Sequence, residues 1–363
     1  MVPTRRLDGV WTSHAFAASC RRLYRPHCAA LVVVTAAEDR IVRMTKVVAL
    51  LLAGTLAIAT AAAQKPIPVI LDTDIGDDID DALALGLALQ SPELNVLAIN
   101  TVLQNGDRRA DLTYKILELY GRTEIPIGVG AEQTLLGKPS TAVVRQTELL
   151  PADYHMPAEK RHNGIQLLVT TCLHSPEKVT LLAYGPLTNL ALALRAEPRI
   201  MQHIERIVLM NGVFFRGGLE YNTYRDPEAS QIVYNSGLPV STVGLDVTLK
   251  CQLSLEHLKQ MEDSKYENVR FLRKLIGIWQ GGDPARRPIL HDPLSVLVTI
   301  QPGLVEFVQG TVEVETKGQP GVSYGLTAFK AGATGNVRVA REVQAGNAVD
   351  LFMTRVGAPP RPK

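Results

Sequence analysis

The stretch of the chain richest in ionisable side chains runs from Val69 to Leu85 and reads VILDTDIGDDIDDALAL. It carries six aspartates within ten residues: Asp72, Asp74, Asp77, Asp78, Asp80 and Asp81. So many carboxylates repel one another at neutral pH unless a cation lies among them. Oxygen ligands of this kind favour a hard divalent ion such as Ca²⁺ or Mg²⁺ over zinc. The stretch therefore predicts a metal site.

The local pattern around these aspartates predicts a strand, a loop and a helix. The β-branched run Val69–Leu71 leads into a glycine-containing turn, and a helical apolar pattern follows. In an open α/β sheet, ligands bind outside the carboxyl ends of the strands, which is where this loop would lie. Acidic residues also cap helix N-termini. That alternative explains Asp78 and Asp80, but it does not explain Asp72 and Asp74, which precede the turn.

A second acidic candidate lies far along the chain, in His291-Asp292-Pro293, just before an apolar helical pattern. Asp292 has a purely structural alternative, as the cap of that helix with Pro293 at its first position. A histidine beside an aspartate also supplies an acid group and a metal ligand. Both interpretations stay open from the residues alone.

Other polar groups follow predicted strand ends. The turn Gly185–Asn189 comes after a strand ending at Tyr184, and its carbonyls suit either a cation or a helix start. Glu220 and Asn222 have no obvious structural role, and in an extended segment they share a face. Asn105 lies just past another strand end, where a turn-forming role is the simpler interpretation.

The elements that must position these residues alternate between strands and helices. We expect strands at Ile67–Leu71, Val96–Val102, Ile125–Val129, Val179–Tyr184, Ile204–Met210 and Val240–Val243. Helical patterns lie between them, near Asp80–Leu89, Arg109–Tyr120, Gly164–His174, Leu187–Arg195 and Pro227–Asn235. This alternation predicts an α/β fold with a mostly parallel sheet covered on both faces. The pattern of residues 254–279 predicts a helical cap at the mouth of the site. We expect residues 305–356 to form strands added at the edge of the sheet and residues 357–363 to form a loose tail.

The first 63 residues have the pattern of a targeting segment. Lys46 is followed by 17 uncharged residues, Val47–Ala63, that end in three alanines. This matches a signal peptide at 44–63, with export to the periplasm or the medium. Translation is expected to begin at Met44, so residues 1–43 form a doubtful extension, with an organellar transit segment as the alternative. The run is too short and too rich in alanine and threonine for a stable membrane span in the mature form.

Composition narrows the class of protein. Of 363 residues, 46% are hydrophobic and 20% charged, which is typical of a globular protein. The formal net charge is +2, and without residues 1–63 it becomes about −3, from 30 basic and 33 acidic residues. Neither value favours nucleic acid as a partner. Only Cys172 and Cys251 follow residue 63, and their spacing does not decide whether they pair.

Taken together, five segments in order resemble the inosine–uridine preferring nucleoside hydrolase family over nearly all of residues 66–356. They are DTDIGDDIDDALAL, GPLTNLALAL, EYNTYRDPEAS, GLDVT and HDPLSVL. The resemblance implies a single domain at 64–363 with a Rossmann-like sheet. It also implies a bound Ca²⁺, a homo-oligomer, and cleavage by water of the N-glycosidic bond of ribonucleosides into ribose and free base, in nucleoside catabolism.

The resemblance also implies roles for individual residues. It implies metal ligands at Asp74, Asp81, Asp292 and the backbone carbonyl of Tyr184. It implies substrate contacts at Asp80, Asn105, Glu220 and Asn222. Asp74 would accept a proton from the attacking water, and His291 would protonate the leaving base. The loop departs from the family pattern, because three residues stand between Gly76 and Asp80 where one is usual. Either Asp78 or Asp80 would then contact the ribose.

Two other functions fit part of the pattern. DTDIG resembles the Asp-x-Asp of haloacid-dehalogenase-type phosphatases, but Gly76 stands where that family has Thr or Val. A secreted Ca²⁺-dependent nucleoside- or sugar-binding protein on the same scaffold is the non-enzymatic alternative. The presence of both a base, Asp74, and an acid, His291, favours the enzyme.

Overall fold

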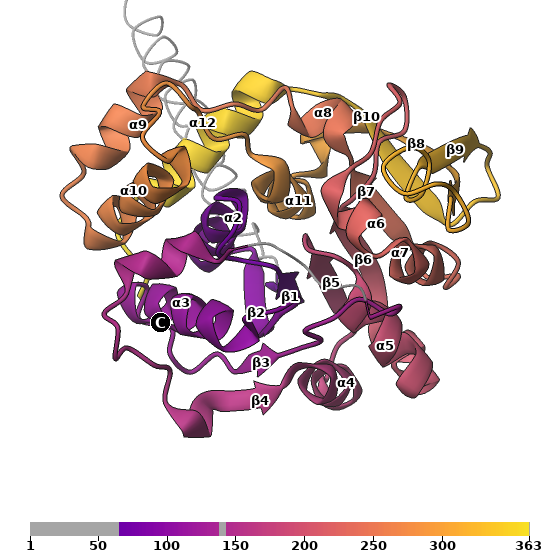
Figure 1. Cartoon of the computed structure of the whole chain (residues 1–363), viewed down its shortest axis with the longest axis horizontal. Coiled ribbons are helices and arrows are strands. Elements are labelled where there is room, and N and C mark those ends of the chain that lie inside the picture. Colours follow the sequence, from indigo (N-terminus) through magenta and orange to yellow (C-terminus); the bar gives the residue numbers. More distant parts are fainter. Residues whose placement is uncertain (1–64, 138–142, 363) are drawn as a thin grey trace, which may run out of the picture. The chain divides into compact units, whose positions relative to one another are not determined.

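The computed structural model describes residues 65–137 and 143–362, which lie in one unit, Lys65–Lys363. The predicted extension at 1–43 and the signal peptide at 44–63 lie outside the described residues. The described chain forms a ten-stranded sheet in the order β4-β3-β2-β1-β5-β6-β7-β10-β8-β9 (Figure 1). The strands are β1 Ile67–Thr73, β2 Leu94–Thr101, β3 Ile127–Val129, β4 Arg161–Asn163, β5 Val179–Ala183, β6 Ile204–Met210, β7 Val240–Val243, β8 Val305–Val314, β9 Thr327–Ala331 and β10 Val337–Val343.

The sheet is parallel from β4 to β10, and only β8 and β9 run antiparallel to their neighbours. The predicted α/β class is therefore confirmed. Strand β1 lies between β2 and β5, so the chain reverses its direction of growth across the sheet at this point. Ligands in such sheets bind at the carboxyl ends of the two strands that flank the reversal. Asp72 and Asp74 lie at the end of β1, and Tyr184 directly follows β5.

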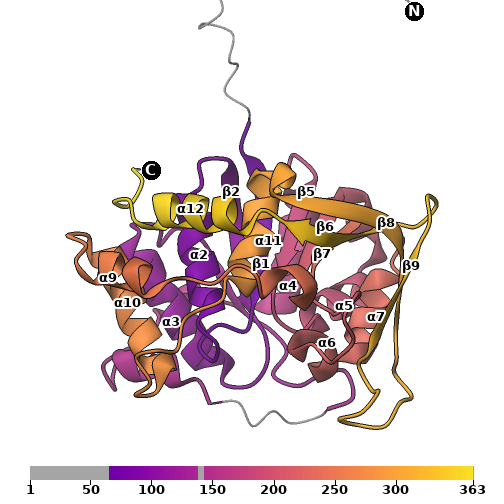
Figure 2. The same ribbon diagram turned by 90° about the horizontal axis from the view of Figure 1, so that it is seen from above.

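Helices cover both faces of the sheet (Figures 1 and 2). One face is covered by α2 Asp80–Gln90, α3 Gly106–Leu119, α11 His291–Ile300 and α12 Ala345–Val356. The other is covered by α4 Gly164–His174, α5 Thr188–Ala196 and α7 Pro227–Tyr234. Short helices α6 Tyr221–Arg225 and α8 Leu245–Thr248 follow the ends of β6 and β7, and α9 Leu255–Glu262 and α10 Glu267–Gln280 form the helical segment predicted at 254–279. The 3₁₀ helices are η1 Arg145–Leu149, η2 Ala158–Lys160, η3 Pro198–His203 and η4 Pro302–Leu304.

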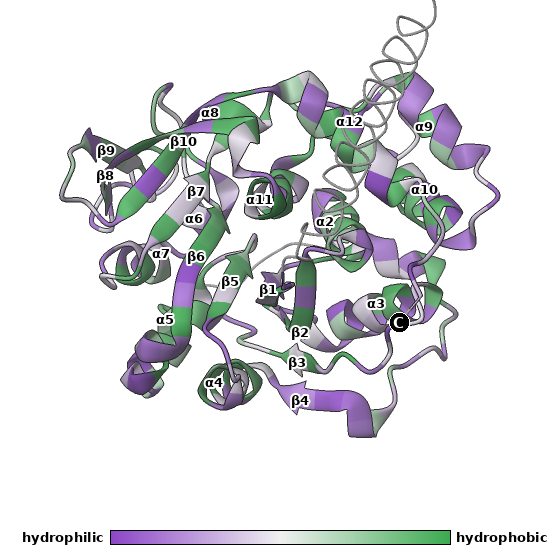
Figure 3. Ribbon diagram, turned by 180° about the vertical axis from the view of Figure 1, so that it is seen from behind, coloured by the Kyte–Doolittle hydropathy of each residue, from purple (hydrophilic) through white to green (hydrophobic). Residues whose placement is uncertain are grey.

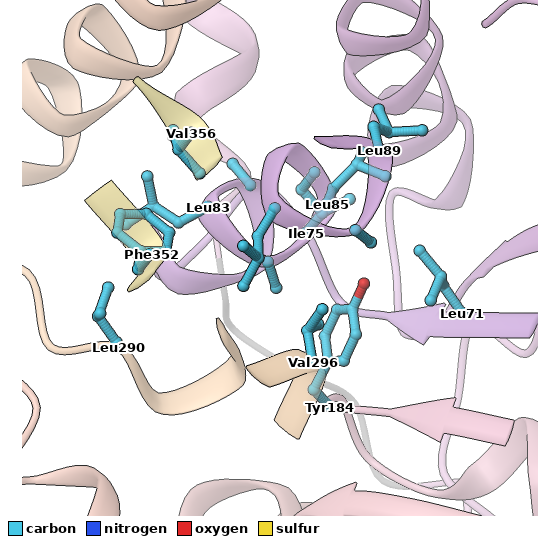
Figure 4. Close-up of a cluster of buried hydrophobic side chains, with 14 of the residues drawn as sticks. Leu71, Ile75, Leu83, Leu85, Leu89, Tyr184, Leu290, Val296, Phe352 and Val356 are labelled. Atoms are coloured by element: carbon cyan, nitrogen blue, oxygen red, sulfur yellow. The ribbon is translucent and has the colours of Figure 1, made fainter. Parts of the chain in front are cut away.

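Helix α2, which begins with Asp80 and Asp81, is buried along its whole length. All eleven of its residues are buried, which follows from a sequence that is apolar all round after its first two aspartates. Figure 4 shows its leucines between Phe352 and Val356 of α12 on one side and Val296 of α11 on another. Because α2 is packed on every side, its first residues, Asp80 and Asp81, are held in fixed positions.

Figure 3 shows hydrophobic residues concentrated in the central strands and the helices packed on them, whereas the edge strand β4 is hydrophilic and exposed. Within the described residues, no helix is long and apolar enough to span a membrane. Cys172 and Cys251 are buried and do not pair with each other.

Two sequence expectations at the C-terminus were wrong. The strands predicted over 305–356 end at Val343, and the remainder is helix α12, whose Ala348, Val349 and Phe352 are buried. Residues 357–362 are not loose either. The buried side chain of Gln90 donates hydrogen bonds from Nε2 to the carbonyls of Ala358 and Pro359, at 3.0 and 2.8 Å. It also accepts one at Oε1 from the backbone of Arg361.

Candidate active site

The loop after β1 is shaped by side-chain hydrogen bonds and by one glycine. Thr73 Oγ1 donates to Asp81 Oδ1 at 2.5 Å and accepts from the backbone of Ile75 at 3.1 Å. Gly76 has φ +116°, and a Cβ at this position would lie 2.2 Å from Val144 Cγ1. The glycine is therefore required both by its backbone conformation and by its neighbour, and the tight turn brings the loop back to the start of α2.

Three carboxylates from two distant segments meet at the start of α2. Asp80, Asp81 and Asp292 are all buried, and ligand oxygens from the three lie within 4.8 Å of one another. Burial raises the pKa of each of them well above the ordinary carboxyl value, and the neighbouring carboxylates raise it further. A cluster of buried oxygen ligands that repel one another fits a hard divalent cation, which would restore all three to the ionised form.

Asp74 lies in the same cavity as this trio but is not one of its members. Burial raises its pKa to about 7, and the guanidinium of Arg109 opposes that rise. A cation bound at the neighbouring cluster would lower this pKa, so that the Asp74 carboxylate would be ionised and able to accept a proton. Asp80 lies in the cluster of three and Asp74 lies in the same cavity, and the roles predicted for them, Asp74 as a metal ligand and Asp80 as a ribose contact, stay predictions.

Asp292 does not cap its helix. Helix α11 begins at His291, and its N-cap, Leu290, makes no side-chain capping bond. Asp292 is therefore not a helix cap, and its carboxylate lies beside those of Asp80 and Asp81. The adjacent His291 accepts or donates a hydrogen bond through Nδ1 with Thr248 Oγ1 at 2.7 Å. Burial lowers the pKa of His291.

Glu220 and Asn222 also line this cavity. The Glu220 carboxylate accepts hydrogen bonds from the backbone nitrogens of Gly212, Asn222 and Thr223, at 3.0, 2.8 and 2.9 Å. Asn222 Nδ2 donates to the carbonyls of Tyr184 and Met210, both at 3.1 Å. Glu220 therefore fixes the start of α6, and Asn222 in turn engages the Tyr184 carbonyl that was predicted as a metal ligand.

These groups line one cavity of about 710 Å³ at the carboxyl ends of the strands. Its lining contains every predicted site residue except Asn105: Asp74, Asp80, Asp81, Tyr184, Glu220, Asn222, His291 and Asp292. Asn105 is exposed at the start of α3, with a left-handed backbone (φ 61°), and it does not line the cavity. The proposed contact of Asn105 with the ribose remains a prediction.

Two groups of residues at this site could not be predicted from the sequence. Arg109 is completely buried and binds the aspartate loop from α3, and a single sequence gives no sign of a buried arginine in an otherwise amphipathic helix. Gln146 of η1 and Trp279 and Arg286 near the end of α10 line the cavity wall. The helical cap expected at 254–279 pointed to that region, but not to these side chains.

Comparisons with known proteins agree with this geometry. The family model for the inosine-uridine preferring nucleoside hydrolases matches residues 69–350. The chain is 33% identical over 311 residues to the pyrimidine-specific ribonucleoside hydrolase of Citrobacter koseri, covering 80% of this chain and 98% of the relative. It is 32% identical over 282 residues to the inosine-uridine preferring nucleoside hydrolase of Crithidia fasciculata, covering 72% and 87%.

Solved structures show the same fold. A plant nucleoside hydrolase superposes with a TM-score of 0.72 and 27% identity, over 81% of this chain and 100% of the plant chain. An inosine-guanosine nucleoside hydrolase superposes with a TM-score of 0.71 and 25% identity, over 80% and 98%. The predicted fold and family are confirmed: this chain belongs to the inosine-uridine preferring nucleoside hydrolase family.

Proposed function

We propose that the protein hydrolyses the N-glycosidic bond of ribonucleosides in a Ca²⁺-dependent reaction that gives ribose and free base. The observation that carries this proposal is the buried cluster of Asp80, Asp81 and Asp292 inside a cavity that also contains a candidate base and a candidate acid. The family match and the names of the relatives support the reaction. The donor set, which consists of oxygen atoms only, supports a hard ion such as Ca²⁺.

The chain's own residues can supply the remaining chemistry. Glycosidic cleavage passes through an oxocarbenium-like state, so the reaction needs an activated water on one side and a protonated leaving group on the other. A bound Ca²⁺ would position that water and lower its pKa. Asp74 lines the cavity together with the cluster, and with a cation bound nearby its carboxylate would be ionised and would accept the proton of the water. His291 is oriented by Thr248 through Nδ1, which leaves Nε2 to donate a proton to the departing base.

The first experiment measures release of free base from a panel of purine and pyrimidine ribonucleosides by the purified protein, before and after chelation. We expect turnover that is lost on chelation and restored by Ca²⁺. Asp74→Ala should abolish it. Calcium-dependent nucleoside binding without turnover would instead favour the binding-protein alternative, and turnover that survives complete chelation would contradict the role of the metal.

We also propose, from the sequence, that the mature protein is exported after cleavage of a signal peptide at 44–63. N-terminal sequencing of the mature form should then begin at Gln64-Lys65-Pro66. A mature form that begins near Met1 would contradict this proposal.

A further inference from the structure

Two guanidinium groups at the exposed rim of the cavity carry positive charge that no carboxylate pairs with. They belong to Arg145, the first residue of η1, and to Arg286, which follows α10, and both residues are exposed and line the cavity. The lining also contains the carboxylates of the aspartate loop, Glu220 and Asp292. In the part of the chain that the structure describes, neither arginine forms an ion pair with any of them. The cavity therefore keeps its positive and its negative groups apart.

Arg286 is held in place by the end of helix α10. Its Nη1 donates a hydrogen bond to the backbone carbonyl of Trp279 at 2.7 Å, and its guanidinium lies over the Trp279 ring, 3.7 Å from the ring centroid. The backbone carbonyl of Arg286 accepts a hydrogen bond from Nε2 of Gln280 at 2.8 Å. The 3₁₀ helix η1, which begins with Arg145, packs against α10. Both guanidiniums therefore belong to the wall of the cavity that α10 and η1 form.

The shape of a ribonucleoside decides which of its parts meets this wall. The 2′- and 3′-hydroxyls suit the cation proposed at Asp80, Asp81 and Asp292, so the base at C1′ and the C5′ group at C4′ point to opposite ends of the cavity. Helices α10 and α6 lie on opposite sides of α2 and α11 (Figures 1 and 2). Trp279 offers aromatic surface for a planar base at the α10 end, whereas Glu220 places a carboxylate at the start of α6. The base therefore meets the wall that carries the two guanidiniums.

We propose that Arg145 and Arg286 make the enzyme favour ribonucleosides whose base carries a negative charge, on a carboxylate or on a deprotonated ring nitrogen. This inference rests on the proposed function. A guanidinium stays charged at every physiological pH and only donates hydrogen bonds. Its charge acts over several ångströms, so the two groups need not contact the same atom of the base. Uracil and hypoxanthine present carbonyl oxygens to the same donors, so the inference agrees with the family that matches the chain.

The test compares kcat/KM for 5-carboxyuridine with that for 5-carbamoyluridine, which carries an amide of the same shape in place of the carboxylate. We expect Arg145→Gln and Arg286→Gln each to lower the ratio of the two values roughly fivefold, the size expected of one pair of charges in water. The intrinsic reactivities of the two substrates cancel, because every variant is measured with both. The change should appear in KM, since the charge of the base is present before and after the bond breaks. High salt should lower the wild-type ratio as well.

Arg287→Gln is the matched control, because Arg287 is exposed and adjacent to Arg286 but lies outside the cavity lining. It should leave the substrate ratio unchanged. Arg286→Lys keeps the charge and should retain most of the ratio. If it lowers the ratio as much as Arg286→Gln does, the contact with Trp279 is responsible and the inference fails for Arg286. A ratio that neither Arg145→Gln nor Arg286→Gln changes would overturn the inference, and so would an equal effect of Arg287→Gln.

Uridine 5′-monophosphate tests whether the guanidiniums meet the base or the C5′ end of the substrate. We expect the wild-type protein to hydrolyse it more slowly than uridine, because its phosphate would lie at the end of the cavity that holds the Glu220 carboxylate. A preference for the monophosphate that Arg145→Gln or Arg286→Gln removes would show that the guanidiniums bind a phosphate, and the assignment to the base would be wrong.

A calorimetric titration with free 5-carboxyuracil and free 5-carbamoyluracil separates this inference from the proposed function. If the protein hydrolyses no nucleoside, the proposed function fails, while tighter binding of the carboxylate that is lost in Arg145→Gln or Arg286→Gln would still support the inference. If nucleosides are hydrolysed but these substitutions leave the substrate ratio unchanged, the function stands and the inference fails.

Discussion

In the loop that follows β1, Nη2 of the completely buried Arg109 donates a hydrogen bond of 2.9 Å to Oδ2 of Asp77. The same guanidinium donates to the carbonyls of Asp74 and Ile75, and its Nε donates to the carbonyl of Gln104 at 2.9 Å. One side chain from α3 therefore binds this turn on both sides of Gly76. Asp77 is one of the residues that make this loop longer than the family pattern, and its hydrogen bond with Arg109 helps to hold the longer loop in place.

We predict that Arg109→Met lowers the free energy of unfolding by about 3 kcal/mol, because it leaves the side chain of Asp77 and several buried carbonyls without their partner. Urea denaturation of the metal-free protein measures this loss. The variant should also bind Ca²⁺ more weakly, since the loop that carries Asp74 is released.

Lys115→Met on the same helix is the control for Arg109. Lys115 pairs with Glu118 at 3.0 Å, and both side chains are about one-third exposed. Surface pairs of this kind contribute little, so the change should stay within about 0.5 kcal/mol. Equal effects of the two substitutions would show that Arg109 has no special role in holding the loop.

A second prediction concerns Asp292, whose buried carboxyl is destabilising unless a cation is bound. Asp292→Asn removes one of three repelling carboxylates and provides an amide that can donate to Asp80. We expect the melting temperature of the metal-free protein to rise. We also expect kcat/KM to fall by at least about 100-fold, because mutation of residues that only contact a metal ligand already lowers metal affinity or activity 10- to 100-fold. Asp350→Asn, at an exposed position of α12, should change neither quantity. A metal-free protein that is less stable after Asp292→Asn would contradict the repulsion described for the cluster.

Much of this architecture could be predicted from the sequence because its signals are local. The apolar run before Asp72 becomes a central strand, and the helical pattern after the loop begins at Asp80, as expected. Most residues that line the cavity could be predicted because each lies just past the end of a strand or at the start of a helix. Parallel topology then brings those ends together.

What could not be predicted depends on contacts between distant segments. Arg109 lies in a helix whose pattern gives no hint that its side chain crosses to the loop after β1. Asn105 follows a strand end just as Asp74 does, yet it faces solvent at the start of α3. The last helix was mistaken for a strand because Val349, Leu351 and Met353 alternate as in a strand, whereas the residues that are buried against the rest of the fold, Val349, Phe352 and Val356, have helical spacing.

A third prediction concerns pH in the metal-free state. Burial raises the pKa of Asp72 to about 8 and that of Asp74 to about 7, well above the ordinary value of 3.8. A carboxyl whose pKa is higher in the folded than in the unfolded chain favours folding only while it is protonated in the folded state. The stability of the chelated protein should therefore decrease as the pH rises from about 4 to 8. Thermal unfolding across this range measures the slope.

Saturating Ca²⁺ should flatten that dependence, because the bound ion favours the ionised carboxylates. A chelated protein whose melting temperature rises steadily between pH 5 and 8 would show that these aspartates are already ionised without a cation. The same result would remove the electrostatic reason for a metal at this site.

The last prediction tests how His291 is positioned. Thr248 is completely buried, and its Oγ1 lies 2.7 Å from His291 Nδ1. Thr248→Val keeps the shape of the side chain and removes this hydrogen bond, so the imidazole loses the contact that orients Nε2 toward the substrate. We expect kcat for inosine to fall roughly 10-fold, the low end of what general acid catalysis contributes, with little change in KM. An activated aryl riboside, whose leaving group needs no proton, should be hydrolysed almost as fast as by the wild type.

The control for Thr248 is Thr299→Val on α11, since Thr299 is also buried but donates its hydroxyl to the Ser295 carbonyl within its own helix. The loss of this hydrogen bond should leave the rates of hydrolysis of inosine and of the aryl riboside unchanged. His291→Ala should reproduce the pattern of Thr248→Val with a larger loss on inosine. If Thr248→Val slows inosine and the aryl riboside equally, the hydrogen bond supports the cavity as a whole, and protonation of the leaving base must be assigned to another group.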